Sequence, residues 1–509
     1  MSKYSFESDT GGLVNESYGL IVPFCYALIQ TDPRTRMVKY SVVEAPLNTQ
    51  EEKWLSVIKD NLTESLDIDF NRLTNEEEAS DYLRKKMIEI VKEYGLKLEE
   101  KVFEKLFYHV QRDFIGFGKI EPLLNDAKIE DISCDGVKVP IYIWHKSHES
   151  VATNIKFDTE EELDSFVIKV AQRSGRHISV ADPLLDASLP DGSRVQLTFG
   201  HEVTRRGSTF TIRKFRSDPM TVVHLIQYNT LDEDLAAYYW YTIEHGKSVL
   251  VAGGTASGKT TLLNALAMFI REGQKIVSIE DTAEINLPHE NWIPAVARQG
   301  FGGYDTSGKR RGEVSLFDLL KSALRQRPDY IFVGEVRGKE AQTLFQAMAT
   351  GHAGMGTIHG DSVAEVIRRL ENDPINVPKV QLQSLDMVAV LRKVRRGKGK
   401  MVRRVIEVRE VVELDNVTNE LVTNKIYSWD PREDVFVNYG RSYILEEIMN
   451  QQGLSEGQIL DELDRRKLIL RWMVKKKMEH FSQVNDVIRD YYRDPDQTYD
   501  RAKRELKQL

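Results

Sequence analysis

Cysteine is scarce in this chain, with 2 residues among 509. Cys25 and Cys134 lie far apart and form no CxxC pair. Two isolated cysteines can build neither a disulfide framework nor a cysteine zinc site. Their scarcity therefore favours a reducing compartment and argues against a cysteine-based metal centre.

The chain also lacks an excess of positive charge. Its 70 Lys and Arg residues are outnumbered by 78 Asp and Glu residues, which gives a net charge of −8. Non-specific binding to nucleic acid normally depends on a broad excess of Lys and Arg. The composition therefore gives no support to such binding by the chain as a whole, although local basic patches remain possible.

Long hydrophobic runs are missing as well. The most apolar N-terminal stretch, residues 20–29, has about half the length that a membrane-spanning helix needs. It follows an acidic leader, whereas a secretory signal begins with a basic one. We therefore expect a cytoplasmic protein without a membrane span.

Internal repeats and low-complexity tracts are likewise missing. With 509 residues the chain is too long to fold around a single hydrophobic core, so about three domains are expected. Apolar spacing and turn residues divide the chain into five segments. They are an N-terminal extension (1–50), a helical region (51–118), an α+β domain (119–217), a domain of alternating strands and helices (218–440) and a charged helical region (441–509).

Strand-like runs define the expected sheets. In the first half of the chain they cover residues 20–30, 38–43, 141–144, 195–199 and 209–213, with turns at 31–34 and 190–193. In the second half they cover residues 248–252, 275–279, 330–333 and 356–358. Helix-like segments separate the second group, which predicts a mostly parallel sheet between helical layers.

Residues 253–260 read Gly-Gly-Thr-Ala-Ser-Gly-Lys-Thr and lie between a strand-like and a helix-like run. Two glycines allow the backbone to bend tightly and approach an anion. The lysine can bridge the β- and γ-phosphates, and the final threonine hydroxyl can bind magnesium. The pattern predicts a nucleoside triphosphate site formed by Gly253, Gly254, Thr255, Ala256, Ser257, Gly258, Lys259, Thr260 and Thr261.

Two acidic elements follow predicted strands of the same domain, where such folds place their chemistry. The first contains Glu280, Asp281 and Glu284, and one of these carboxylates could orient the attacking water or accept its proton. The second places Glu335 just after the apolar run 330–333, which fits a strand that carries an acid to magnesium.

A third element contains two histidines around a turn of small residues and a short strand. His352 and His359 occupy this element, residues 350–360. A lone histidine is more often a packed residue than a catalyst, but behind a phosphate loop both become candidates for sensing the γ-phosphate.

These four motifs, in this order, resemble the Walker A, Asp-box, Walker B and His-box of the type II/IV secretion ATPase superfamily. Upstream, residues 116–124 and 191–195 are similar to the N-terminal domain of that family, and the resemblance covers roughly residues 110–410. The N-terminal extension and the helical tail resemble the archaeal branch, which includes the archaellum motor ATPase and archaeal pilus-assembly ATPases.

The resemblance implies an α/β fold in which an N-terminal α+β domain is joined to a RecA-like P-loop ATPase domain, with the C-terminal helical region appended. It also implies a homohexamer that binds ATP and Mg²⁺ in a cleft between the two domains. Lys259 and Thr260 would bind phosphate and magnesium. Glu335 would be the Walker B acid and a magnesium ligand, partly through water, and Glu284 the catalytic carboxylate.

Glu280 is expected to support the site. The acidic box reads Glu-Asp-Thr-Ala-Glu rather than the Glu-Asp-Pro-Ile-Glu of many bacterial pilus motors, so the division of labour between Glu280 and Glu284 stays open. The tetracysteine zinc module of bacterial members is missing, and no metal besides magnesium is expected.

The family also implies arginines that neutralise charge on the transferred phosphate. Arg194 and Arg213 are the first candidates, with Arg205 and Arg206 behind them, because they lie in the N-terminal-domain segment. Such arginines would make hydrolysis depend on domain closure. Exposed arginines on surface strands are the alternative interpretation.

Residues 392–404 carry eight Lys and Arg residues between two strand-like runs, which predicts a basic hairpin. One interpretation is a solvated edge that resists sheet aggregation. The other is electrostatic docking to a membrane-protein partner or an anionic membrane, through residues such as Arg395, Arg396 and Lys398.

The sequence thus predicts an ATPase motor that assembles or rotates an archaellum-type filament through a polytopic membrane platform protein, together with accessory cytoplasmic motor proteins. An archaeal type IV pilus or type II secretion motor is the alternative, and a nucleic-acid translocase a further one, although no specific nucleic acid is expected as a partner. A signalling GTPase fits poorly, because the nearest approach to its guanine-reading motif, residues 424–427, lacks the aspartate.

Overall fold

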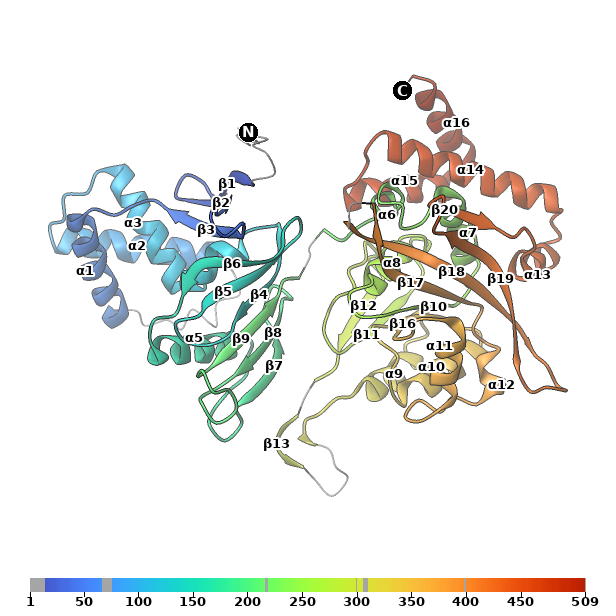
Figure 1. Cartoon of the computed structure of the whole chain (residues 1–509), viewed down its shortest axis with the longest axis horizontal. Helices are drawn as coiled ribbons and strands as arrows, with labels where there is room; N and C mark the ends of the chain where they lie inside the picture. Colours follow the sequence, from blue (N-terminus) through green and yellow to red (C-terminus); the bar gives the residue numbers. More distant parts are fainter. Residues whose placement is uncertain are drawn as a thin grey trace. The chain divides into compact units, whose positions relative to one another are not determined.

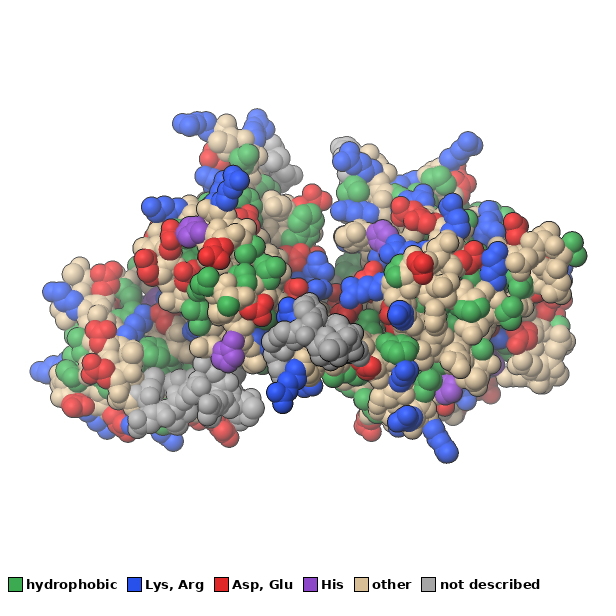
Figure 2. Space-filling view, turned by 90° about the horizontal axis from the view of Figure 1, so that it is seen from below, with side chains coloured by type: hydrophobic (Ala, Val, Ile, Leu, Met, Phe, Trp, Pro, Cys, Tyr) green, Lys and Arg blue, Asp and Glu red, His purple; other side chains and the backbone are tan. Residues whose placement is uncertain are grey.

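The computed structural model describes residues 14–65, 76–215, 218–298, 300–304, 310–397 and 400–508. The chain forms two compact units, unit 1 up to residue 215 and unit 2 from residue 216. Each unit has a large sheet of its own with helices beside it (Figure 1). In both units, the face in Figure 2 shows acidic and basic side chains interspersed, as the nearly balanced charge of the chain requires.

Within its described residues, unit 1 contains a nine-stranded sheet in the order β1-β2-β3-β6-β5-β4-β9-β8-β7. Neighbouring strands are antiparallel except β3 and β6, which pair in parallel through Lys39 and Tyr40. The strands are β1 (Asn15–Ile21), β2 (Cys25–Thr31), β3 (Val38–Glu44), β4 (Ile129–Cys134), β5 (Pro140–His145), β6 (Glu149–Lys156), β7 (Leu184–Ser188), β8 (Arg194–Thr198) and β9 (Thr209–Arg213).

Helices of unit 1 form two groups. Helix α5 (Glu160–Arg173) packs on the sheet and buries Leu163, Val167 and Val170 against β8 and β9. Helices α1 (Thr49–Ser65), α2 (Glu76–Glu93) and α3 (Glu100–Phe114) have a small apolar core of their own. The short helices η2 (Gly118–Ile120) and α4 (Glu121–Leu124) connect α3 to β4.

The predicted hairpin near the N-terminus is present as β2 and β3, which pair in antiparallel register from Cys25 to Thr31. The single strand expected over residues 20–30 is wrong, however, since β1 ends at Ile21 and β2 begins at Cys25. Pro23 lies in the gap, and a proline cannot donate to a strand ladder. The run is therefore split into two strands.

Unit 2 contains a second nine-stranded sheet, in the order β12-β11-β15-β16-β10-β17-β18-β19-β20 within its described residues. The first six strands are parallel and the last three antiparallel. The strands are β10 (Val249–Gly253), β11 (Ile276–Glu280), β12 (Trp292–Val296), β15 (Tyr330–Val333), β16 (Ala353–Ile358), β17 (Met387–Arg396), β18 (Lys400–Leu414), β19 (Leu421–Asp430) and β20 (Val435–Asn438), with β13 (Phe301–Tyr304) and β14 (Arg310–Arg311) paired separately.

Helices cover both faces of this sheet, as the alternation of strands and helices predicted. Val249 and Val251 of β10 face one apolar core, and Leu250 and Ala252 face the other. The first core includes α6 (Val222–Gln227), α7 (Glu233–Glu244) and α8 (Lys259–Ala267), and the second includes α9 (Leu316–Leu324), α10 (Glu340–Ala349), α11 (Val363–Glu371) and α12 (Lys379–Leu382).

The C-terminal region is helical, as expected, and it shares the first core. It consists of α13 (Tyr443–Gln452), α14 (Glu456–Lys475), α15 (Phe481–Arg493) and α16 (Pro495–Leu506). In Figure 1, α14 and α15 lie on one side of the unit 2 sheet and α9 to α12 on the other. Helix α14 packs along α7, so the tail is an integral part of the α/β unit. The five sequence-based segment boundaries stay predictions.

A buried ion pair joins α14 to α7. The guanidinium of Arg466 contacts the carboxylate of Glu244, and both side chains are buried. Burial raises the pKa of Glu244, but Arg466 and Arg271 more than offset this, so its pKa lies below the ordinary value and the carboxylate stays charged. Removing one partner of such a pair leaves a buried charge without its compensation.

Replacing Arg466 by alanine should therefore destabilise unit 2 by about 3 kcal/mol, at the low end of the usual range because Arg271 still contacts Glu244. Chemical denaturation of the purified protein measures this loss. The matched control is Arg465→Ala, whose partner Asp496 is exposed, and which should cost less than about 1 kcal/mol. Equal losses in the two variants would contradict the structural importance of the buried pair.

No helix within the described ranges is both long and apolar enough to cross a membrane.

Candidate nucleotide-binding site

The phosphate loop joins the end of β10 to the start of α8, as the sequence predicts. Gly258 has φ of +98°, a left-handed conformation that favours glycine. A Cβ on Gly253 would lie 2.5 Å from the carbonyl oxygen of Leu391, which leaves no room for a side chain. The hydroxyl of Ser257 donates to the carbonyl oxygen of Gly254 at 2.8 Å. The two glycines permit the tight bend of the loop, and the Ser257–Gly254 hydrogen bond stabilises it.

Lys259, the first residue of α8, folds back over the loop. Its Nζ donates to the carbonyl oxygens of Gly253 and Gly254, at 3.0 Å each. Burial lowers the pKa of Lys259, while the negative charges of Glu335 and Glu284 oppose this shift. The structure therefore places the lysine amine in the field of both predicted catalytic carboxylates.

Glu335 follows β15 at the carboxyl edge of the parallel strands, and two bonds from β16 hold its neighbours. The hydroxyl of Thr357 donates to the carbonyl oxygen of Gly334 at 2.6 Å, and the N–H of Val336 donates to the carbonyl oxygen of Thr357 at 2.8 Å. Glu335 therefore sits on a main chain that is fixed on both sides at the carboxyl edge of the parallel strands.

Glu280 ends β11 and has only 2% of its surface exposed. Its Oε1 accepts hydrogen bonds from the N–H groups of Glu284 and Ile285, at 2.9 and 3.0 Å. Burial raises the pKa of Glu280 to about 8, and the two backbone bonds only partly offset this. These contacts tie Glu280 to the loop that carries Glu284, and the catalytic roles of the two carboxylates stay predictions.

This burial predicts a pH dependence. Because the pKa of Glu280 is raised above its ordinary 4.5, folding favours the protonated form, and the associated stability falls as pH rises from about 4.5 to about 8. Glu280→Gln keeps an acceptor oxygen but does not titrate. We expect its melting temperature to fall less between pH 6 and pH 9 than that of the wild type, as measured by calorimetry. Parallel curves for the two proteins would contradict the raised pKa.

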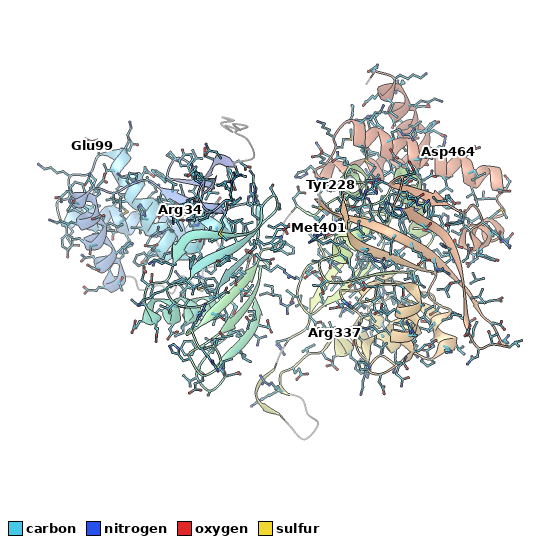
Figure 3. The ribbon with its side chains drawn as sticks, in the orientation of Figure 1. Arg34, Glu99, Tyr228, Arg337, Met401 and Asp464 are labelled. Atoms are coloured by element: carbon cyan, nitrogen blue, oxygen red, sulfur yellow. The ribbon has the colours of Figure 1, made fainter. Side chains whose placement is uncertain are left out.

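Glu284 has an exposed side chain on a fixed main chain. Its N–H donates to Glu280, and its carbonyl oxygen accepts from Nδ2 of Asn264 on α8 at 3.0 Å. The neighbouring Asp281 pairs with Arg337 at 2.5 Å; Arg337, which follows β15, is labelled in Figure 3. The main chain of Glu284 is thus tied to both β11 and α8, while its carboxylate can face a substrate.

The two predicted histidines lie at opposite ends of β16. Ile358 pairs with Ala252 of β10, so His359 follows at the level of Gly253, where the phosphate loop begins. His352 precedes the strand, seven residues before His359, which puts it about 23 Å from His359 at roughly 3.3 Å per residue. Its Nδ1 lies 3.3 Å from the carbonyl oxygen of Ala347. The structure therefore brings His359 but not His352 to the phosphate loop of its own unit.

The candidate arginines belong to unit 1. Arg194 of β8 and Arg213 of β9 are directly opposite each other in the ladder. Arg194 lies 3.9 Å from Asp186, and Nε of Arg213 donates to Asp131 at 3.2 Å. Arg205 and Arg206 lie in the β8–β9 turn and line a depression of about 380 Å³ next to Cys134. The first two are thus gathered on one face, and a role toward nucleotide stays a prediction.

Comparison with known proteins gives a family match over most of the chain. The sequence model of the family described as type II/IV secretion system protein matches residues 115–455. The chain belongs to this family. It is 37% identical over 482 residues to Uncharacterized protein MJ0900 of Methanocaldococcus jannaschii, covering 90% of this chain and 86% of that protein.

Two further relatives extend the comparison. The type IV secretion system protein PtlH of Bordetella pertussis is 32% identical over 284 residues, covering 49% of this chain and 81% of that protein. Among solved structures, the VirB11 ATPase of the Brucella suis type IV secretion system is 25% identical, with a TM-score of 0.28, and covers 59% of this chain and 93% of that one.

The site of this type II/IV secretion system protein fits a magnesium ion held with a triphosphate. Thr260 directly follows Lys259 at the start of α8, and the negative charge of Glu335 opposes the lowering of the pKa of Lys259 by burial. A hydroxyl and a carboxylate are the hard oxygen donors that magnesium prefers, with phosphate and water filling its other positions. Thr260 and Glu335 are therefore suitable ligands.

Residues that the sequence did not single out also contribute to the site. Asp361 and Arg369 act electrostatically on Lys259, and an Nη of Arg369 donates to the carbonyl oxygen of His359 at 3.3 Å. Glu340 is buried and accepts hydrogen bonds from the N–H groups of Arg337 and Gly338. Asp361 follows His359 and Gly360 directly after β16. Its position after a core strand was the one feature of the sequence that could have marked it as a site residue.

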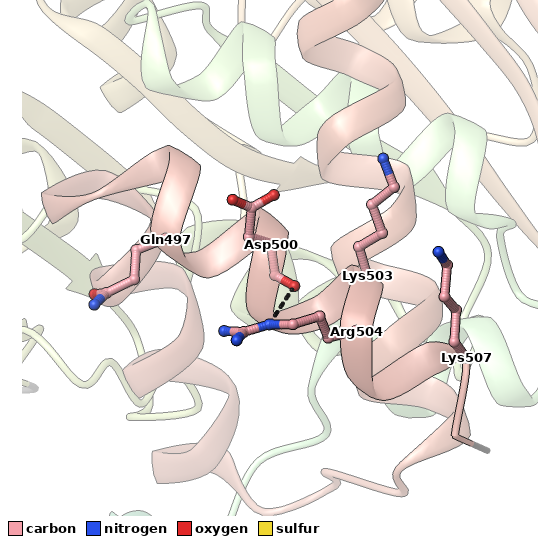
Figure 4. A pocket seen from close by; sticks show the side chains of 5 residues that line it. All are labelled: Gln497, Asp500, Lys503, Arg504 and Lys507. Carbon is pink, nitrogen blue, oxygen red and sulfur yellow. Dashed lines mark hydrogen bonds between the residues drawn. The ribbon is translucent and has the colours of Figure 1, made fainter.

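A second depression of about 380 Å³ lies on the outer face of α16 in this secretion-family chain (Figure 4). It is lined by Gln497, Asp500, Lys503, Arg504 and Lys507, and Nε of Arg504 donates to the carbonyl oxygen of Asp500. Four of these residues belong to α16, Lys507 follows its last residue directly, and none of the five belongs to the predicted site. This depression therefore plays no part in the chemistry considered below.

Proposed function

We propose that this chain is a magnesium-dependent ATP hydrolase that converts hydrolysis into mechanical work on a membrane-anchored filament machine. The observation that carries this proposal is the placement of Lys259, Glu335 and Glu284 at one carboxyl edge of the unit 2 sheet, with the two carboxylates acting on the lysine. Membership of the type II/IV secretion system protein family supports it.

In the proposed reaction, the phosphate loop binds the β-phosphate through its N–H groups, and Lys259 leaves the loop carbonyls to bridge the β- and γ-phosphates. Glu284 orients a water molecule and accepts its proton as the oxygen attacks the γ-phosphorus. The bond between that phosphorus and the β,γ-bridging oxygen breaks, which yields ADP and inorganic phosphate. A magnesium ion, held by Thr260 and partly through water by Glu335, would neutralise charge on the phosphate oxygens.

His359 is proposed to sense the γ-phosphate, since its position at the end of β16 is level with the start of the phosphate loop. The same role for His352 would require another subunit or another conformation. Glu280 is proposed to act through Glu284, whose N–H it holds, rather than on the water itself.

We further propose a homohexamer in which Arg194 and Arg213 supply positive charge to the nucleotide. The two arginines are directly opposite each other on adjacent strands, where like charges repel and destabilise a sheet. A bound anion would relieve this repulsion, which supports a role toward the phosphates. Asp186 and Asp131 provide partial compensation in unit 1.

For the cargo, we propose assembly or rotation of an archaellum-type filament through a polytopic membrane platform protein, with accessory cytoplasmic motor proteins as further partners. The chain would act in the cytoplasm, attached peripherally to the inner face of the membrane. The likeness to MJ0900 of Methanocaldococcus jannaschii, which covers 90% of this chain and 86% of that protein, supports the archaeal branch. An archaeal type IV pilus or type II secretion motor is the alternative.

Replacing the chromosomal gene with one that encodes Lys259→Ala, and scoring swimming and piliation separately, distinguishes an archaellum motor from a pilus motor. Loss of swimming with normal piliation supports the archaellum role, whereas loss of pili with normal swimming supports the pilus motor and contradicts the archaellum assignment. With the purified protein, ATP turnover should not respond to DNA or RNA. Stimulation by either would favour a nucleic-acid translocase.

A further inference from the structure

The hairpin formed by β17 and β18 extends past the carboxyl edge of the parallel strands, beside the phosphate loop. Its first strand pairs with β10 up to Leu391, which is opposite Gly253. Residues 392–396 then continue beyond β10 and pair with residues 400–404 of β18. Met401, in this outer part, is labelled in Figure 3. The outer hairpin, defined as residues 392–397 and 400–404, therefore flanks the loop that follows β10.

Several arginines of the outer hairpin are engaged within unit 2. Arg404 is buried and forms two bonds to the carboxylate of Asp434, at 2.8 and 2.9 Å. Arg396 contacts the carbonyl oxygen of Pro431, and Arg392 donates to the carbonyl oxygen of Asp361 at 2.9 Å. The interpretation of the whole run as a solvated edge is therefore incomplete. Lys398, suggested above for docking, lies outside the described residues.

Arg403 reaches the phosphate loop itself. Its Nε donates to the carbonyl oxygen of Ala256 at 3.2 Å, across 147 positions of sequence. Ala256 has φ of +56°, a left-handed conformation that is unfavourable for a residue with a side chain. A Cβ on Gly258 would lie 3.1 Å from Cδ of Arg403, so the arginine side chain passes close over the loop.

We propose that Arg403 is a positioning residue that holds the phosphate loop in its binding conformation from the β17–β18 hairpin. A charge-assisted hydrogen bond is comparable in strength to the cost of one left-handed non-glycine residue. The hydrogen bond from Arg403 to the carbonyl oxygen of Ala256 can therefore stabilise the left-handed conformation of Ala256, which is unfavourable without it. The proposal rests on the proposed nucleotide site, because the loop held by Arg403 is the one that binds the phosphates.

The test measures binding of mant-labelled ATP by fluorescence for the full-length wild type, Arg403→Ala, Ala256→Gly and the double variant. Arg403→Ala should bind about tenfold more weakly, the effect of losing one charge-assisted hydrogen bond. Glycine tolerates the left-handed conformation without help. In the Ala256→Gly background, Arg403→Ala should therefore weaken binding of mant-labelled ATP by no more than about twofold. The effects of the two substitutions on the binding free energy are then not additive.

Arg432→Ala is the matched control, because Arg432 is exposed in the β19–β20 turn of the same sheet, and it should bind as the wild type does. An equal loss on removing Arg403 in both backgrounds, or no loss in either, overturns the positioning role. Failure of the wild type to bind the probe would instead contradict the proposed function. The two failures are therefore distinguishable.

Discussion

Replacing Lys259 by alanine should reduce ATP turnover by about 100- to 1000-fold, the usual effect of removing one group that stabilises charge in a transition state. The amine lies on the phosphate loop, where it donates to the carbonyl oxygens of Gly253 and Gly254 at 3.0 Å each. Its loss should also weaken nucleotide binding, because the phosphates lose their point charge. Phosphate release and equilibrium binding measure the two effects.

The control for this prediction is Lys507→Ala, which removes one exposed lysine directly after α16 and should leave turnover unchanged. Both variants should unfold at the wild-type temperature. Turnover of Lys259→Ala within about threefold of the wild type would contradict the placement of the triphosphate on this loop.

Replacing Glu284 by glutamine should reduce kcat by about 100- to 10,000-fold, the range for a lost general base. Nucleotide binding should change little, since the phosphate loop and Lys259 are intact. The side chain of Glu284 is exposed while its main chain is held by Glu280 and Asn264, so the substitution removes a proton acceptor without loosening its support. Steady-state kinetics together with equilibrium binding separate these effects.

Two matched variants identify which carboxylate acts on water. Glu280→Gln should lose less than about tenfold in kcat, because an amide oxygen can still accept the two backbone bonds. Glu290→Gln removes an exposed carboxylate a short distance along the chain and should have no effect. A larger loss in Glu280→Gln than in Glu284→Gln would reverse the roles assigned to the two residues.

Much of the ATPase unit could be predicted because its signals are local. The strands expected at residues 248–252, 275–279 and 330–333 appear as β10, β11 and β15 within one residue, since buried parallel strands read as short apolar runs. The phosphate loop could be predicted from its local motif, and the left-handed φ of Gly258 explains one of its glycines locally. Gly253, in contrast, makes room for the carbonyl oxygen of the distant Leu391. The strand expected at 356–358 begins three residues earlier, at Ala353, because the glycines at 354 and 356 interrupt its apolar run.

The less predictable features depend on pairing between distant segments. Strand β12 and the C-terminal helices join the α/β unit through contacts that no short window contains. The two histidines were grouped because they are close in sequence, yet six residues of extended chain separate them in space. The basic run was interpreted by charge alone, which does not reveal that Arg404 and Arg403 have partners inside the unit.

The sequence by itself determined that a phosphate loop is present, that acids follow the neighbouring strands, and that these motifs occur in the order of a secretion-family ATPase. Each of these depends on a few adjacent residues. Only the tertiary structure decided that Glu280 is buried and supports Glu284, that His359 rather than His352 lies level with the loop, and that Arg403 contacts Ala256. The physical reason is that burial and strand register are set by segments far apart in the chain.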